Sequence, residues 1–126
     1  MTKVRIRRVV ARTRWQLVTF VGGRGGESVG VVDLLAIRKD HSPPHQGMKR
    51  GDALHIVLIQ VKGGSAAMPT VEDGIRLRAV AKRHGAEQSL LGVWKKGKAV
   101  EFFRLQPKAS AGDDWIEITN LDEIFH

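Results

Sequence analysis

The stretch that decides the fold reads Leu54-His55-Ile56-Val57-Leu58-Ile59-Gln60-Val61-Lys62-Gly63-Gly64. It is apolar over most of its length, lacks alternation of apolar and polar residues, and ends in two glycines. This pattern is typical of a central strand that is covered on both faces of a sheet. Gln60 and Lys62 interrupt it near its end, so their polar groups require partners.

A second apolar segment precedes this strand and reads Val29-Gly30-Val31-Val32-Asp33-Leu34-Leu35-Ala36-Ile37. We expect it to be a central strand with Asp33 inside it. An acid, an amide and a lysine are disfavoured in such strands unless they meet each other, or a metal ion and a phosphate. Gln60 and Lys62 leave the same face of their strand about 6–7 Å apart. If the two strands are neighbours, Asp33 joins them in one polar pocket.

The chemistry of this pocket is that of a metal-dependent nuclease. The Asp33 carboxylate, the Gln60 amide oxygen and the Val61 backbone carbonyl are hard oxygen ligands suited to Mg²⁺ or Mn²⁺. Such an ion lowers the pKa of a bound water and stabilises charge on a phosphate in transfer. Lys62 would orient that water or stabilise the transition state. The alternative is an Asp33–Lys62 ion pair, with Gln60 hydrogen-bonded to it, in a core that cuts nothing.

The rest of the chain predicts an α/β fold with a mixed sheet. The segments Arg8–Val10 and Trp15–Val21 are rich in β-branched and aromatic residues and predict an N-terminal strand or strand pair. A helix follows the central strands, with Thr70 as its N-cap and Gly85 as its C-terminal stop. The remaining expected elements are a glycine loop over Gly22–Gly26, a long loop over His41–Gly47, strands over Ser89–Trp94 and Ala99–Leu105 that flank a Lys95–Lys98 turn, and an edge strand over Trp115–Thr119.

Composition indicates one globular domain with a polyanionic partner. The 126 residues contain 21 Lys and Arg against 13 Asp and Glu, a net charge of +8. We expect a single domain over 1–126, with a basic N-terminal segment at 1–20 and an acidic extension at 107–126. No apolar run approaches the roughly 20 residues that span a bilayer, and no signal-peptide core is present. We therefore expect a cytoplasmic protein that binds nucleic acid rather than a membrane.

These features together resemble the PD-(D/E)XK nuclease superfamily. The likeness rests on Gly30–Ala36 and Ile59–Gly63, followed by the helix and the strand Leu91–Trp94, and it runs from about Val21 to Leu105. Within the superfamily the chain looks closest to archaeal Holliday junction resolvases and Mrr-type nucleases, and a glutamine in place of the third motif's acid is known among the latter. The resemblance implies a restriction-endonuclease-like sheet flanked by helix, Mg²⁺-dependent hydrolysis of DNA that is possibly branched, and a homodimer.

One departure from that family concerns a second acid. The family usually carries a Glu on a helix before the Asp strand, whereas this chain has no acid before Glu27. In a straight strand Glu27 would lie roughly 20 Å from Asp33, so only a chain reversal near Gly30, or a partner subunit, would bring it close. Glu27 is our candidate for a further metal ligand. The N-terminal segment reads as strand, so we expect the family's first helix to be missing.

Several residues outside the pocket are candidates for nucleic-acid contact. Arg24 lies in the glycine loop, and Ser28 follows it, although hydroxyls and glycines in turns are often only structural. The other candidates are Arg5, Arg7, Arg8, Lys95 and Lys96. His41 and His45 have a spacing that binds zinc on a helix, but Pro43 and Pro44 exclude that helix. We interpret His55 as a core or edge histidine with satisfied hydrogen bonds.

The leading hypothesis is therefore a small, resolvase-like DNA endonuclease that hydrolyses phosphodiesters with Mg²⁺ or Mn²⁺. A non-catalytic nucleic-acid-binding module on a degenerate nuclease fold is the alternative. A third hypothesis is an interaction domain whose basic charge is incidental. The DNA structure preferred, and the choice between DNA and RNA, are not set by these residues.

Overall fold

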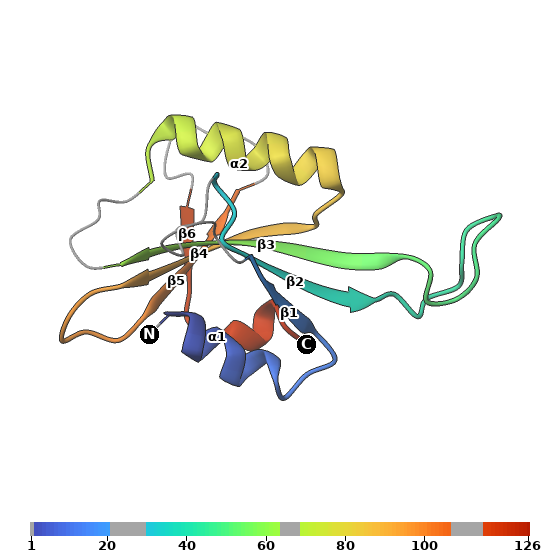
Figure 1. The fold of residues 1–126 in the computed structure, drawn as a ribbon, viewed down its shortest axis with the longest axis horizontal. Coiled ribbons are helices and arrows are strands. Elements are labelled where there is room, and N and C mark those ends of the chain that lie inside the picture. Colours follow the sequence, from blue (N-terminus) through green and yellow to red (C-terminus); the bar gives the residue numbers. More distant parts are fainter. Residues whose placement is uncertain (1, 21–29, 64–68, 107–114) are drawn as a thin grey trace.

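The chain forms a six-stranded sheet with one α-helix on each face (Figure 1). A computed structural model describes residues 2–20, 30–63, 69–106 and 115–126. Within these ranges the strands lie in the order of the sequence, and only β3 and β4 run parallel. The elements are α1 (Thr2–Val10), β1 (Gln16–Thr19), β2 (Leu34–Lys39), β3 (Leu54–Gly63), α2 (Val71–His84), β4 (Gln88–Trp94), β5 (Glu101–Leu105), β6 (Trp115–Ile118) and the 3-10 turn η1 (Leu121–Glu123). The predicted single-domain α/β fold with a mixed sheet is confirmed.

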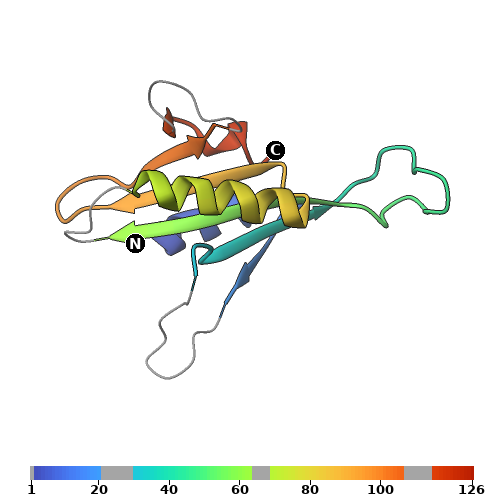
Figure 2. The same ribbon diagram turned by 90° about the horizontal axis from the view of Figure 1, so that it is seen from above.

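The two helices lie on opposite faces of the sheet. Helix α2 runs over β3 and β4 and is the crossover between these two parallel strands (Figure 2). Helix α1 and the C-terminal turn η1 lie against the other face (Figure 1). Because α2 runs back along β3, its N-terminus lies near the end of β3 that carries Gln60 and Lys62. No helix in the described ranges is both long and apolar enough to cross a bilayer.

Helix α2 is bounded by the residues that the sequence indicates. The Thr70 hydroxyl accepts a hydrogen bond from the Asp73 N–H at 3.1 Å, and the Asp73 carboxylate accepts one from the Thr70 N–H at 3.1 Å. This reciprocal capping box satisfies two of the free N–H groups at the helix start. Gly85 ends the helix with φ 66°, a left-handed conformation that glycine adopts at little cost. Leu77 is fully buried against the sheet.

Helix α1 corrects the prediction for the N-terminal segment. Arg8–Val10 were expected in a strand and the family's first helix was expected to be missing, but Thr2–Val10 form a helix. Ile6 and Val10 are four residues apart and are 0% and 4% exposed, so one helix face enters the core. Arg7 and Arg8 lie in the last turn, where cations complement the helix dipole.

The strand that precedes β3 also differs from its prediction. It was expected over Val29–Ile37 with Asp33 inside, whereas β2 begins at Leu34, so Asp33 lies just before the strand. Gly30 has φ 104°, a conformation that glycine favours, and it lies where the chain approaches the sheet. The expected strand over Trp15–Val21 is confirmed as the shorter β1. The predicted end of β3, the turn between β4 and β5, and the edge strand β6 are also confirmed.

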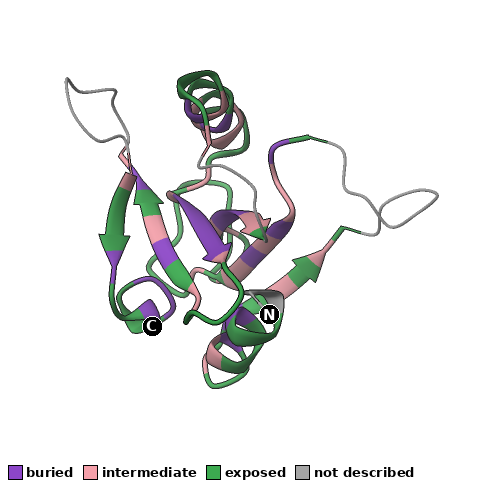
Figure 3. Cartoon of the chain, turned by 90° about the vertical axis from the view of Figure 1, so that its left-hand side faces the viewer, coloured by how far each residue is buried: buried purple, intermediate pink, exposed green. Residues whose placement is uncertain are grey.

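The larger core lies between the sheet and α1. Trp15 and Phe125 meet edge-on there, with ring centroids 5.6 Å apart. The C-terminal residues Leu121, Ile124 and Phe125 are buried in it, so residues 115–126 belong to the packed domain. The central strands β3 and β4 each carry a run of consecutive buried residues, whereas β2 alternates between buried and half-buried positions (Figure 3). The smaller core, beneath α2, is centred on Val31, Leu58, Leu77 and Leu105.

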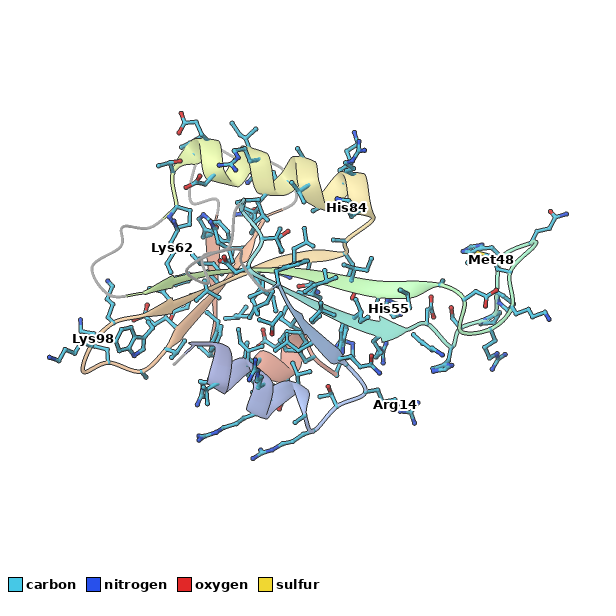
Figure 4. The ribbon with its side chains drawn as sticks, viewed as in Figure 1. Arg14, Met48, His55, Lys62, His84 and Lys98 are labelled. Atoms are coloured by element: carbon cyan, nitrogen blue, oxygen red, sulfur yellow. The ribbon has the colours of Figure 1, made fainter. Side chains whose placement is uncertain are left out.

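A long hairpin projects from the sheet between β2 and β3 (Figures 1 and 2). The predicted loop over His41–Gly47 forms its tip and is exposed throughout. Asp40 helps to order the hairpin, because its carboxylate accepts a hydrogen bond from the Ser42 N–H at 2.9 Å. The hairpin extends from the end of the sheet that is opposite to Lys62 (Figure 4).

Candidate functional site

Asp33 is attached to β3 through its side chain as well as its backbone. Its N–H donates to the Ile59 carbonyl at 2.9 Å, beside Leu34–Ile59, the first pair of the β2–β3 ladder. Its carboxylate oxygen Oδ2 then accepts a hydrogen bond from the Val61 N–H at 2.7 Å. The acid is therefore held against the segment that carries Gln60 and Lys62.

Gln60 and Lys62 lie on the face of the sheet that α2 covers. Leu58 packs in the core beneath α2, and Gln60 and Lys62 follow it at intervals of two residues along β3. Leu35 contacts the same core, and Asp33 precedes it by two residues. The hydrogen bond to Val61 thus holds Asp33 at the end of β3 that carries Gln60 and Lys62, and Figure 4 shows Lys62 at this end.

The Gln60 side chain is buried with an unsatisfied oxygen. Its residue is 6% exposed, and its Oε1 atom has no hydrogen-bond partner among the described residues. A buried acceptor left without a donor costs about 1–3 kcal/mol. Val31 is buried and Val32 packs beside it just before Asp33, so the surroundings of the site include apolar side chains. A buried side-chain oxygen without a donor is more typical of a ligand site than of a core that only stabilises the fold.

Lys62 is half-buried and makes no ion pair within the described part of the chain. The ion pairs of the described residues do not include the Asp33–Lys62 pair that the alternative interpretation required. The Asp33 carboxylate instead bonds to the β3 backbone. The ammonium group of Lys62 stays available on the same face as Gln60.

The donor set fits a divalent ion that prefers oxygen. The described residues contain no group of three His, Cys, Asp or Glu side chains that could hold a metal. The site instead offers one carboxylate, one amide oxygen and the Val61 carbonyl, which are ligands suited to Mg²⁺ or Mn²⁺. Helix α1 is present but its sequence contains no acid. Glu27, the candidate for a further ligand, lies outside the described residues.

The predicted nucleic-acid contacts fall into three groups. Arg24 and Ser28 lie outside the described residues. Lys95 and Lys96 are exposed in the turn after β4, and the pairing of Gly63 with Trp94 places this turn at the Lys62 end of the sheet. The third group is on α1, against the opposite face, and comprises Arg5, Arg7 and Arg8, of which Arg7 donates to the Thr19 hydroxyl at 3.4 Å.

His55 lies on the other face of β3 and is fully engaged. Its Nδ1 lies 2.9 Å from a Glu87 carboxylate oxygen, and its Nε2 lies 3.6 Å from Asp40. Hydrogen bonds from the hydroxyl and backbone of Ser42 hold the pKa of Asp40 below its usual value, with a smaller effect of the nearby His55 charge. This agrees with the interpretation of His55 as a satisfied edge histidine and separates it from the candidate site.

The bond between Asp33 and the Val61 N–H is the feature of the site that sequence reasoning missed. An Asp33 inside the strand would bond to β3 through its backbone alone, whereas in the structure its carboxylate also accepts a hydrogen bond from β3. Gly30 is the sequence feature that could have indicated this bond, because a glycine shortly before an acid allows the chain to turn toward the sheet at that point.

These elements define a single α/β domain with a resolvase-like nuclease fold. No family model and no curated protein matches the sequence. Among solved structures, the chain is similar to Hjc, a Holliday junction resolvase from the hyperthermophilic archaeon Archaeoglobus fulgidus, with a TM-score of 0.50 and 14% sequence identity. The match covers 93% of this chain and 84% of the resolvase. At this identity the likeness concerns the fold, and membership of the PD-(D/E)XK superfamily stays a prediction.

Proposed function

We propose that the protein is a metal-dependent DNA endonuclease of the resolvase type, which hydrolyses phosphodiester bonds. The observation that carries the proposal is the hydrogen bond from the Val61 N–H to Asp33, because it holds the acid at the segment of β3 that carries Gln60 and Lys62. The fold shared with a protein described as a Holliday junction resolvase supports DNA, possibly branched, as the substrate. The net charge of +8 supports binding to a polyanion.

A Mg²⁺ or Mn²⁺ ion would be held by the Asp33 carboxylate, the Gln60 amide oxygen and the Val61 carbonyl. When bound, it would supply a more acidic water and stabilise negative charge on the phosphate. With only one carboxylate among the described residues of the site, we expect weak binding of the ion until a DNA phosphate adds its own oxygen. Metal affinity should therefore rise when DNA is present.

The chain's own residues supply position and charge. Asp33 is fixed by the β3 backbone before any ligand arrives, so little ordering is required on binding. Lys62 carries a flexible cation that would contact a phosphate oxygen or the attacking water. The apolar neighbours Val31 and Val32 limit the water around the carboxylate, which strengthens its attraction to a cation.

A cleavage assay tests the proposal. Supercoiled plasmid and four-way junctions are incubated with Mg²⁺ or Mn²⁺ and with the wild type, Asp33→Asn or Lys62→Gln. We expect the wild type to cut and both variants to lose cutting while they still bind DNA. Cleavage that survives both substitutions would contradict the assignment of the site.

The alternative function is a non-catalytic nucleic-acid-binding module. One observation favours it, namely that α1 lacks the acid that the family carries on its first helix. In that case the wild type binds DNA in a salt-dependent and metal-independent manner but does not cut it. The same assay, read alongside a gel shift in EDTA, separates the two functions.

We also propose that the protein is a homodimer. Val71 and Ile75 lie one turn apart on α2 and are 63% and 56% exposed, which is unusual for apolar residues that face only water. A second copy would cover them. Sedimentation should show a dimer at micromolar concentration for the wild type and a monomer for Ile75→Asp, and a wild-type monomer would refute the proposal.

A further inference from the structure

A small depression at the far end of the sheet from Lys62 is lined by cations. Its volume is about 190 Å³, and its basic lining residues are Arg14, Arg38, Lys39 and His41, together with the apolar residues Ile37 and Leu54. None of the described residues that line it is acidic. In Figure 4 Arg14 lies away from Lys62, toward the hairpin and on the side of α1.

Two of these side chains are brought together by a turn. Atoms Lys39 Cδ and His41 Cε1 lie 3.9 and 4.0 Å from the position that a Cβ on Gly51 would take. Gly51 has φ 88°, and its N–H donates to the Asp40 carbonyl at 3.2 Å, so the turn is fixed to the end of β2. The ion pairs within the described ranges involve neither Arg14 nor Lys39 nor His41. Arg14 and Lys39 therefore make the lining of the depression basic.

The depression lies on the same face of the sheet as the candidate site. Ile37 follows Leu35 by two residues on β2, and Leu54 precedes Ile56 by two residues on β3. Leu35 and Ile56 both pack against the core beneath α2, the face that also carries Gln60. Lys39 pairs with Leu54, which is six residues from Gln60 and eight from Lys62 along β3. At about 3.3 Å per residue, these separations correspond to roughly 20 and 26 Å.

We propose that this depression is a second contact for the backbone of the bound DNA, about eight nucleotides from the phosphate at Lys62. The spacing follows from the rise of about 3.4 Å between successive phosphates of a DNA strand. Arg14 and Lys39 attract the phosphates, and the apolar residues between them fit the sugar carbons. Helix α2 covers the β3 and β4 side of this face, so a duplex arm that contacts both ends runs beside α2, over β1 and β2 (Figure 2). The inference rests on the proposed function, since it places the substrate that this function requires.

Charge-neutral variants test the contact by affinity and salt dependence. Arg14→Gln and Lys39→Gln should each weaken binding of a 30-base-pair duplex by up to about fivefold and reduce the slope of log affinity against log salt by about 1. Arg12→Gln is the matched control, because Arg12 is exposed two residues away, just after α1 on the other side of the sheet. Wild-type affinity for Arg14→Gln and Lys39→Gln, or an equal loss for Arg12→Gln, would overturn the inference.

Site-directed crosslinking tests the spacing. The sequence contains no cysteine, so Lys39→Cys and Lys62→Cys each carry a single photoreactive label. In EDTA, on one defined duplex or junction arm, their crosslinks should be about eight nucleotides apart. Crosslinks at the same nucleotides, or none from position 39, would overturn the contact while leaving the nuclease proposal intact. Failure of the wild type to bind DNA at low salt would instead remove both proposals.

Discussion

The carboxylate of Asp33 occupies the place of a backbone carbonyl opposite Val61. In an antiparallel ladder the Val61 N–H would bond to the main chain of the neighbouring strand, but here it donates to Asp33 Oδ2 at 2.7 Å. The strand β2 starts one residue later. Asp33 therefore both accepts a hydrogen bond that stabilises the sheet and supplies the negative charge of the candidate site. Substitutions can separate these two roles.

Asp33→Ala should destabilise the protein more than Asp33→Asn. Alanine leaves the Val61 N–H without its acceptor, at a cost of about 1–3 kcal/mol, whereas the amide oxygen of asparagine can still accept that bond. Chemical denaturation of both variants measures the difference. Both should lose metal-dependent cleavage, because neither carries the charge. Equal stability of the two variants would show that the hydrogen bond contributes little to folding.

Gln60→Glu should make the stability of the protein depend on Mg²⁺. A carboxylate placed at this buried position is unpaired without a cation and lowers the melting temperature in EDTA. Mg²⁺ should restore the melting temperature in this variant by more than it raises that of the wild type, since only a bound ion offsets the buried charge.

Gln88→Glu provides the control for this experiment. Gln88 also has a buried, unpartnered side-chain oxygen, but it pairs with Val57 of the core on the α1 side. The Gln88→Glu variant should have a lower melting temperature that Mg²⁺ does not restore. Rescue of both variants, or of neither, would mean that position 60 is not a metal ligand.

The central strand and α2 could be predicted because local and tertiary preferences agree there. The run that ends at Gly63 suits a strand covered on both faces, and Thr70 and Gly85 bound a helix that the sheet then buries. Helix α1 was missed because Val4 and Ile6 alternate with basic residues as in a strand, and Val9 and Val10 are β-branched. Only packing against the sheet, through Ile6 and Val10, selects the helix.

The candidate site, like the fold, could be predicted only in part from the sequence. Spacing alone placed Gln60 and Lys62 on one face, because the period of a strand is two residues. The adjacency of Asp33 depended on which strands pair, and the antiparallel β2–β3 ladder supplies it. The burial of the Gln60 oxygen follows from three-dimensional packing, which no short motif encodes.

Thr70→Ala should weaken α2 where it begins, near the site. It removes the hydroxyl that accepts from the Asp73 N–H, and such a loss costs about 1 kcal/mol. Thr70→Ser keeps the hydroxyl and is the matched control. Urea denaturation should show a lower free energy of unfolding for alanine alone, and an equal loss for serine would mean that the Thr70 methyl group, rather than the cap, matters.

Ser42→Ala should raise the pKa of Asp40 toward its usual value. The Ser42 hydroxyl is the largest cause of the lowered pKa, and the Ser42 N–H, 2.9 Å from Asp40 Oδ1, remains in the variant. A carboxyl with a lowered pKa in the folded state contributes stability above its unfolded pKa, and this is lost as the pH falls through the folded value. The hairpin should therefore loosen at a higher pH in Ser42→Ala. An NMR titration of Asp40 measures the shift, and an unchanged pKa would contradict the prediction.

Lys62→Gln should abolish cleavage with little effect on folding. Lys62 makes no ion pair among the described residues, so its removal leaves no unpaired partner in the sheet and stability should change by less than about 0.5 kcal/mol. Lys98→Gln, in the turn at the same end of the sheet, removes an equal charge without touching the site (Figure 4). Both variants should bind DNA slightly more weakly and show a shallower salt dependence, because each loses one phosphate-binding charge. Only Lys62→Gln should stop hydrolysis in a single-turnover assay with saturating protein. If Lys98→Gln reduces the cleavage rate as much, Lys62 acts through general attraction of the phosphate and has no direct part in the reaction.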